Sequence, residues 1–202
     1  MFSLHPYATD SDERDKIVPY VGVVSIATVF VIHVLLDHWG ISVPWWLDMP
    51  SPIVLYFAMR RLLDVALWRS SFLRTLGLVS IPDLNGRWVG WLRSNATDGM
   101  KTPCEVVIRQ TWTTIGIVLE TATSRSANLV AGILVDSVYD AELQYDFLNE
   151  PKANAPGTME KHRGSVTLNL EVMNGSATLT GDYFTGRGRS SHGELHLRRE
   201  ES

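Results

Sequence analysis

The chain of 202 residues contains a single cysteine, Cys104, and no excess of basic residues. One cysteine excludes an internal disulfide framework and a metal site built from several thiolates. The formal net charge of −4 argues against a protein that coats DNA or RNA polymers, because such proteins are basic. The sequence also has no P-loop, nucleophile elbow or H-E-x-x-H motif. We therefore expect no enzymatic activity, no catalytic residues and no cofactor.

One pair of histidines has a spacing that is found in metal sites. His192 and His196 are four positions apart, a spacing that brings two ligands together on a helix. The surrounding residues alternate as in a strand, where this spacing only places both rings on one face. We therefore expect no metal site.

Long apolar runs are rare, with one exception near the N-terminus. Val18 to Leu36 is an apolar run with His33 near its end, close to the roughly 20 residues that a helix needs to cross a bilayer. The charged lead Asp10–Lys16 precedes it, and no small-residue cleavage site follows. This arrangement predicts a retained transmembrane helix at about 18–36 and not a cleaved signal peptide.

A second apolar segment covers about residues 45–68 and contains Arg60, Arg61 and Asp64. Ser51 followed by Pro52 is a good helix start, because the hydroxyl can cap and proline lacks only an N–H that the first turn leaves unpaired. We expect a membrane region at 1–79 with two transmembrane helices. The alternative is one crossing followed by an interfacial amphipathic helix. The basic residues flank this pair of helices, so the positive-inside rule places both termini in the cytoplasm.

From residue 80 onward the apolar period changes to two, which is typical of β-strands. Asn174-Gly175 lies between two such runs and is a strong signal for a tight hairpin. Eight antiparallel strands suggest a closed up-and-down barrel over residues 80–202, with a sandwich as the alternative. The candidate strands are Leu84–Ser94, Pro103–Gln110, Thr114–Thr121, Asn128–Ser137, Glu142–Leu148, Ser165–Val172, Ala177–Tyr183 and Gly193–Arg199.

The first candidate strand carries Gly86-Arg87-Trp88, and Arg198 lies near the end of the last strand. This pair is similar to lipocalin-like barrels, in which a tryptophan plugs the closed end and an arginine packs on it. An ordinary core tryptophan remains the alternative. An eight-stranded barrel is wide enough to hold one small ligand.

If Trp88 marks the closed end, the open end carries the loops 95–102, 122–127, 149–164 and 184–192. These loops are rich in hydroxyl groups and arginine, which suit a phosphate, and tyrosine or phenylalanine nearby could stack on a base. A solvated basic loop above core aromatics is the alternative interpretation. The candidate ligand-binding residues are Ser124, Arg125, Ser126, Tyr145, Asn149, Tyr183, Phe184, Arg187 and Arg189.

The order of several blocks resembles the two-transmembrane β-barrel effectors of bacterial cyclic-oligonucleotide-based antiphage signalling (CBASS). The blocks are Leu84–Trp91 (LNGRWVGW), Ile108–Trp112 (IRQTW), Leu143–Pro151 (LQYDFLNEP), His162–Leu168 and Leu179–Leu197 (LTGDYFTGRGRSSHGELHL). Tyr145, Asn149, Tyr183 and Arg187 lie in these blocks.

The resemblance implies that the barrel binds a cyclic dinucleotide made by a partner CD-NTase, a nucleotidyltransferase active during phage infection. Binding would promote self-association, and the helices would then disrupt the bacterial inner membrane, in which the chain is a multi-pass protein, and kill the infected cell. The alternative function is a membrane-tethered lipocalin-like carrier for a lipid or another small apolar ligand.

Overall fold

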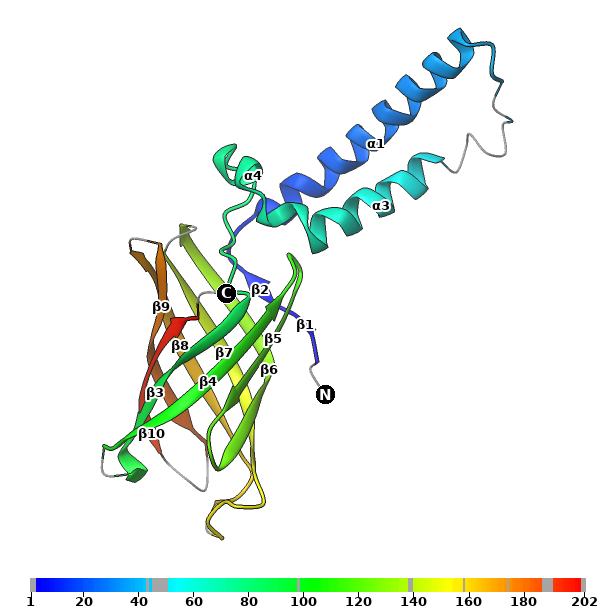
Figure 1. Cartoon of the computed structure of the whole chain (residues 1–202). Coiled ribbons are helices and arrows are strands. Elements are labelled where there is room, and N and C mark those ends of the chain that lie inside the picture. Colours follow the sequence, from blue (N-terminus) through cyan, green and yellow to red (C-terminus); the bar gives the residue numbers. More distant parts are fainter. Residues whose placement is uncertain are drawn as a thin grey trace. The chain divides into compact units, whose positions relative to one another are not determined.

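The computed structural model describes residues 3–42, 44, 51–97, 99–137, 140–157, 159–173, 175–186 and 191–200. The chain divides into two compact units. One unit contains Asp12–Val79, and the other joins Met1–Ser11 to Ser80–Ser202. Figure 1 shows helices in the first unit and a β-barrel in the second.

The described part of the helical unit contains two main helices and two short ones. They are α1 (Glu13–His38), α3 (Ser51–Val65), η1 (Leu67–Arg69) and α4 (Ser71–Thr75). Glu13 and Asp15 stand in the first turn of α1, where carboxylates are favourable beside the positive end of the helix dipole. Helices α1 and α3 pack against each other, and the Ser25 hydroxyl on α1 donates to the Met59 sulfur on α3 at 3.4 Å.

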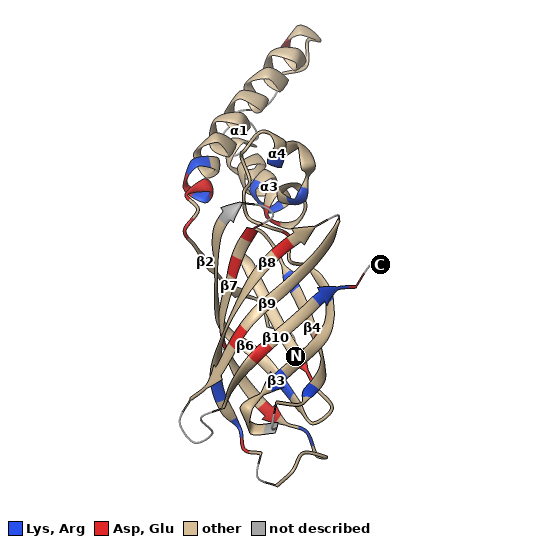
Figure 2. Cartoon of the chain, turned by 90° about the vertical axis from the view of Figure 1, so that its left-hand side faces the viewer, with Lys and Arg blue, Asp and Glu red and all other residues tan. Residues whose placement is uncertain are grey.

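Helix α1 is long and apolar enough to cross a bilayer, which makes it a candidate membrane span. Tyr20, Val23, Ile26 and Phe30 all expose more than half of their surface. Figure 2 shows that charged residues on α1 lie only near its two ends. A soluble helix would normally keep such a surface away from water, so this helix needs a partner or an apolar surrounding.

Helix α3 has 15 residues in the described part, and residues 45–50 of the predicted second span lie outside it. Its charged residues form a local pair, since Arg61 contacts the Asp64 carboxylate at 3.3 Å. The continuous helix ends at Val65, and Ser70 then caps α4 by accepting a hydrogen bond from the Leu73 N–H at 3.3 Å.

The second unit confirms the predicted eight-stranded antiparallel barrel. Its sheet order is β5-β4-β3-β10-β9-β8-β7-β6, and a β5–β6 pairing closes it. The strands are β3 (Gly86–Ser94), β4 (Lys101–Gln110), β5 (Thr114–Glu120), β6 (Ser124–Ser137), β7 (Asp140–Pro151), β8 (His162–Met173), β9 (Ser176–Thr185) and β10 (His192–Arg199). Closure leaves the main ladder without a free edge.

The closing seam between β5 and β6 is short, with only three residue pairs from Val118–Ala127 to Glu120–Arg125. Beyond those pairs the two strands separate, and two short N-terminal strands occupy the gap. Strand β1 (His5–Pro6) pairs antiparallel with β5, and β2 (Ala8–Thr9) pairs parallel with β6. The polar lead of the chain is therefore part of the barrel, which the sequence analysis did not predict.

One end of the barrel is filled by Trp88, which is fully buried. Its indole N–H donates to the Leu84 carbonyl at 3.0 Å. The guanidinium over its ring belongs to Arg199, 5.0 Å from the ring centroid, and Arg199 also donates to the Asp83 carbonyl. The predicted partner Arg198 is therefore wrong by one residue. Successive side chains on a strand point to opposite faces, so Arg198 points outward and donates to the Ser176 hydroxyl at 3.1 Å.

The strand boundaries differ from the prediction mainly at the end of the barrel opposite Trp88. Strand β6 already begins at Ser124, β7 continues to Pro151, and β8 begins at His162. The predicted loops 122–127 and 149–164 are thus shorter than expected. Asn174 of the predicted hairpin lies outside the described residues, while Gly175 has a φ of +80° that suits glycine in a tight turn.

Candidate ligand-binding site

A cavity of about 150 Å³ lies inside the barrel at the end opposite Trp88. Its walls come from all eight strands and from the ends of the predicted rim loops. Among the described residues the lining consists of Leu92, Ser94, Thr102, Leu119, Thr121, Thr123, Ser124, Ser126, Tyr145, Phe147, Asn149, Met159, His162, Val166, Tyr183, Thr185, Ser191 and Leu195. The open end is therefore the one that the sequence predicted.

One wall of the cavity is a row of three side chains across neighbouring strands. Tyr145 on β7 pairs with Val166 on β8, and Val166 pairs with Tyr183 on β9. All three line the cavity. The Tyr183 ring extends towards β10, since a Cβ atom at Gly193 would be 2.9 Å from it.

The next row up contains Phe147 and Gly164, which also pair directly. A Cβ atom at Gly164 would meet the Phe147 ring at 2.5 Å and the Phe184 carbonyl at 2.4 Å. Glycine at this position therefore allows the phenylalanine ring to lie flat across β8. The Phe147 ring also contacts the His162 ring edge-on, with centroids 6.4 Å apart.

Above these rings the lining becomes polar, and most of its hydroxyl groups bond within the protein. Ser126 donates to the Asn149 Oδ1 atom at 2.9 Å. The Thr121 and Ser124 hydroxyls are 3.0 Å apart across the β5–β6 turn. Thr185 donates to the Ser191 carbonyl at 3.1 Å and so fixes the two ends of the loop 186–190. These hydrogen bonds hold the described side chains of the rim in place.

The hydroxyl of Tyr145 differs from these hydrogen-bonded groups. Its side chain is only 5% exposed, and the hydroxyl has no hydrogen-bond partner among the described residues. A buried polar group without a partner costs roughly 1–3 kcal/mol, so such groups in proteins call for an explanation. Burial, and to a smaller degree the nearby Cys104, raises the pKa of Tyr145, which keeps the hydroxyl protonated. It can therefore donate to a bound molecule.

Cys104 lies on the inner face of β4 and is buried. Burial raises the pKa of its thiol to about 11. A thiol that stays protonated at neutral pH is a poor nucleophile and a poor metal ligand. Among the described residues, no group of three His, Cys, Asp or Glu could hold a metal.

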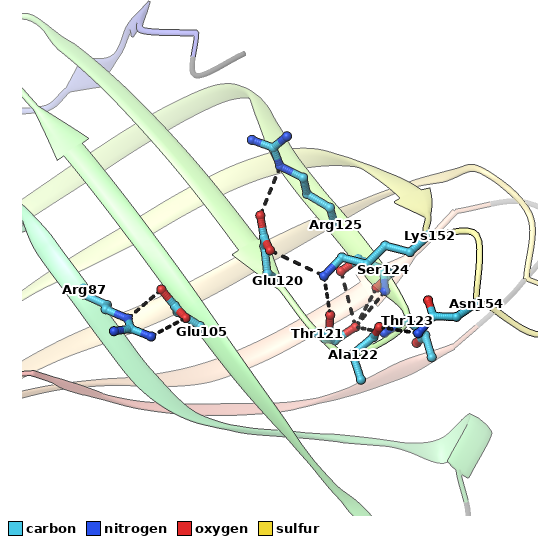
Figure 3. Close-up of polar contacts among 10 residues, drawn as sticks. All are labelled: Arg87, Glu105, Glu120, Thr121, Ala122, Thr123, Ser124, Arg125, Lys152 and Asn154. Atoms are coloured by element: carbon cyan, nitrogen blue, oxygen red, sulfur yellow. Dashed lines mark hydrogen bonds and ion pairs between the residues drawn. The ribbon is translucent and has the colours of Figure 1, made fainter.

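The described lining of the cavity contains no Lys, Arg, Asp or Glu. The charged residues nearby form ion pairs on the outside of the rim, as Figure 3 shows. Arg125 contacts Glu120 at 3.4 Å, and Lys152 contacts the same carboxylate at 3.4 Å while donating to the Thr121 carbonyl at 2.8 Å. Asn154 donates to the Ala122 carbonyl at 3.1 Å. These contacts attach the β7–β8 loop to the β5–β6 turn.

The structure brings five of the nine predicted site residues together. Ser124, Ser126, Tyr145, Asn149 and Tyr183 all line the cavity. Arg125 does not line the cavity and contacts Glu120. Phe184 is also not in the lining and exposes 58% of its surface. Arg187 and Arg189 lie outside the described residues.

Strand alternation explains both the misplaced residues and the ones that the sequence analysis missed. On β6, Ser124 and Ser126 face inward, so Arg125 between them faces outward. On β9, Tyr183 and Thr185 face inward, so Phe184 does not. The same rule applied to Tyr145 and Asn149 would have identified Phe147. The apolar floor formed by Leu92, Leu119 and Leu195 carries no such signal, because these residues look like ordinary core.

The barrel matches a known protein family. Residues 79–199, more than half of the chain, match the family model described as "Cap15, cyclic dinucleotide receptor domain". A curated relative, CD-NTase-associated protein 15 of Yersinia aleksiciae, is 29% identical over 147 residues, which cover 73% of this chain and 68% of the relative. The matched family region contains the eight strands and every described residue of the cavity lining. The resemblance to CBASS effectors is confirmed, and the chain belongs to the Cap15 family of cyclic dinucleotide receptor domains.

Proposed function

We propose that this chain is a membrane-embedded antiphage effector whose barrel binds a cyclic dinucleotide made by a partner CD-NTase. Binding promotes self-association of the chain, and its helices then disrupt the bacterial inner membrane and kill the infected cell. The observation that carries this proposal is the cavity at the open end of a barrel of the receptor family. Its wall contains the Tyr145 hydroxyl, which has no hydrogen-bond partner among the described residues.

The cavity supplies what binding of a nucleotide requires. Tyr145, Phe147 and Tyr183 offer aromatic surfaces in its walls, and such surfaces stack on nucleobases. Ser126 offers a hydroxyl and Asn149 an amide next to these rings. In this proposal Ser124, Ser126, Tyr145, Asn149 and Tyr183 contact the ligand. Arg187 and Arg189, in the loop whose ends are Gly186 and Ser191, remain predicted phosphate contacts.

The helical unit supplies the effector activity in this proposal. Helix α1 presents an exposed apolar surface over most of its 26 residues, and α3 packs beside it. We propose that α3 with the preceding residues forms a second span, so that both termini are cytoplasmic. In this proposal the barrel acts as a receptor and not as an enzyme, in line with the receptor domain that its family model describes.

The direct test uses the full-length protein in detergent and a panel of cyclic dinucleotides that carry A, G, C or U in all pairs. At 100 times its dissociation constant, a ligand that binds only the folded state adds about 2.7 kcal/mol to the free energy of unfolding. We expect one or a few members of the panel to raise the melting temperature. A melting curve that no member shifts contradicts the proposed function.

The lower half of the cavity favours one other candidate function. Leu92, Leu119, Val166 and Leu195 make its floor apolar, which would also suit a lipid tail or another small apolar ligand. Native mass spectrometry of the purified protein separates the two functions. A lipid that co-purifies in the barrel and is not displaced by any cyclic dinucleotide supports the carrier.

A further inference from the structure

The size of the cavity limits how much of a cyclic dinucleotide can enter it. Sites that enclose a complete drug-sized ligand usually have about 300–1,000 Å³. A cavity of the size found here, about 150 Å³, is comparable to an engineered protein cavity that binds benzene. Two bases, two sugars and two phosphates exceed this space, whereas one base matches it.

The charge of the cavity limits which part of the ligand enters. A phosphate that leaves water needs cations or several donors around it. The described lining contains no Lys or Arg, and the hydroxyls of Thr121, Ser124, Thr185 and Ser191 already bond to one another in pairs. An uncharged ring therefore enters at far lower cost than a phosphate does.

Two buried polar groups of the described lining are placed to recognise that ring. The Tyr145 hydroxyl is buried in the cavity wall and has no partner among the described residues. Asn149 is 4% exposed, and its Oδ1 atom already accepts a hydrogen bond from Ser126. The Nδ2 group is the part of this amide that remains for a ligand. Both groups donate, so they match acceptor atoms on the edge of a base.

We propose that a single base of the cyclic dinucleotide inserts into the cavity and is recognised by the Tyr145 hydroxyl and the Asn149 amide. The phosphates and the second base stay at the open end. This inference rests on the proposed function and specifies how the same site reads its ligand. Val166 sets the depth of insertion, because it lies between the Tyr145 and Tyr183 side chains in the row that crosses β7, β8 and β9.

The first experiment compares two buried tyrosines, one in the cavity wall and one outside it. Tyr145→Phe removes a hydroxyl that has no partner among the described residues, and Tyr7→Phe removes a hydroxyl that donates to the Trp112 carbonyl at 2.8 Å. Dissociation constants of full-length protein are measured by calorimetry with the cyclic dinucleotide that stabilises the wild type most. Melting temperatures are measured without ligand.

We expect Tyr145→Phe to weaken binding about tenfold, the effect of losing one buried hydrogen bond, and to leave the melting temperature unchanged or higher. Tyr7→Phe should lower the melting temperature and leave the dissociation constant unchanged. If Tyr145→Phe binds as tightly as the wild type, its hydroxyl does not contact the ligand and the inference is overturned.

The second experiment fills the cavity from its floor. Val166→Phe places a ring where the base would lie, and Val130→Phe is the matched control, because Val130 on β6 is 57% exposed and does not line the cavity. Insertion predicts a loss of at least a hundredfold in affinity for Val166→Phe and little change for Val130→Phe. Unchanged binding by a folded Val166→Phe would place the whole ligand at the rim. If this variant does not fold, the Tyr145→Phe comparison decides alone.

The two proposals fail in different ways. Wild-type protein that binds no cyclic dinucleotide refutes the proposed function and this inference with it. Wild-type protein that binds, together with Tyr145→Phe and Val166→Phe variants that bind equally well, refutes only the insertion of a base.

Discussion

The phenolic hydroxyl of Tyr7 donates a hydrogen bond to the backbone carbonyl of Trp112 at 2.8 Å, although 105 positions separate the two residues. Gln110 donates to the same hydroxyl at 3.4 Å. Tyr7 is only 4% exposed and stands between β1 and β2, in the gap where β5 and β6 separate. The N-terminal segment therefore completes the barrel wall directly before α1 begins.

Replacing Tyr7 should destabilise the barrel. We expect Tyr7→Ala to lower the free energy of unfolding by about 3–5 kcal/mol, because it removes a buried aromatic ring and leaves a cavity. Tyr7→Phe should cost about 1 kcal/mol, the net value of one hydrogen bond. Urea denaturation followed by tryptophan fluorescence measures both. Leu4→Ala is the control, since Leu4 is 46% exposed, and an equal loss there would contradict a specific role for Tyr7.

Asn128 on β6 bridges to β5 in the same seam. Its side-chain oxygen accepts a hydrogen bond from the Ile117 N–H at 2.8 Å, at a point where β6 is irregular between Asn128 and Val130. The amide thus replaces a ladder bond that the separated strands cannot form. Asn128→Ala leaves a buried N–H without a partner and should cost about 1–3 kcal/mol.

The matched control for Asn128 is Asn154→Ala. Asn154 also makes one hydrogen bond, to the Ala122 carbonyl, but at an exposed position on the rim. We expect this change to cost less than about 0.5 kcal/mol. Equal losses in the two variants, measured by the same denaturation curves, would show that the seam needs no side-chain bridge.

Arg198 and Arg199 provide a comparison at the closed end. Arg199 lies over Trp88 and donates to the Asp83 carbonyl, whereas Arg198 is exposed and donates to the Ser176 hydroxyl at 3.1 Å. We expect Arg199→Ala to lower the free energy of unfolding by about 1–2 kcal/mol and Arg198→Ala to change it by less than about 0.5 kcal/mol. The reverse order would contradict the assignment of Arg199 as the arginine that packs on the tryptophan.

Arg198 and Arg199 show which features of the fold the sequence can predict and which it cannot. Alternation in runs such as Leu143, Tyr145 and Phe147 is strong enough to predict eight strands, a closed barrel and the end at which the cavity lies. It cannot by itself give the register between distant strands. The position of Arg199 beside Trp88 depends on the pairing of β10 with β3, which no local pattern specifies.

Strands β1 and β2 could not be predicted for a different reason. Each has two residues, and a period of two cannot be recognised in so short a segment. Their pairing is determined by the gap that β5 and β6 leave, which is a property of the whole barrel. Arg125 and Phe184, in contrast, could have been excluded from the site in advance, since each stands between two residues that face inward.

The buried thiol of Cys104 predicts a loss of stability at alkaline pH. In the unfolded chain a thiol loses its proton near pH 8.5, whereas in the folded chain burial raises the pKa of Cys104 to about 11. Between these values the unfolded state binds fewer protons, so the free energy of unfolding falls as the pH rises. The stabilisation is complete below about pH 8.5 and is lost as the pH approaches 11.

The two pKa values differ by about 2.5 units, which corresponds to about 3 kcal/mol. Denaturation curves between pH 7.5 and 10.5 should therefore show a decline in the wild type that is smaller in Cys104→Ala. Burial raises the pKa of Tyr145 as well, so part of the decline above pH 10 should persist in that variant. A decline of equal size in both proteins would contradict the contribution of the thiol.

Ser11 and Ser80 define where the membrane region can be removed. Their hydroxyl oxygens are 3.1 Å apart, and both residues belong to the barrel unit, while Asp12–Val79 forms the other. A short Gly-Ser linker in place of residues 12–79 keeps β1 and β2 in the seam.

We expect this linked barrel to bind the cyclic dinucleotide as the full chain does, and not to kill cells that express the partner nucleotidyltransferase. Truncation to residues 80–202 is the comparison, and it should melt at a lower temperature because the seam is unfilled. A linked barrel that still kills cells would contradict the assignment of the effector activity to the helices.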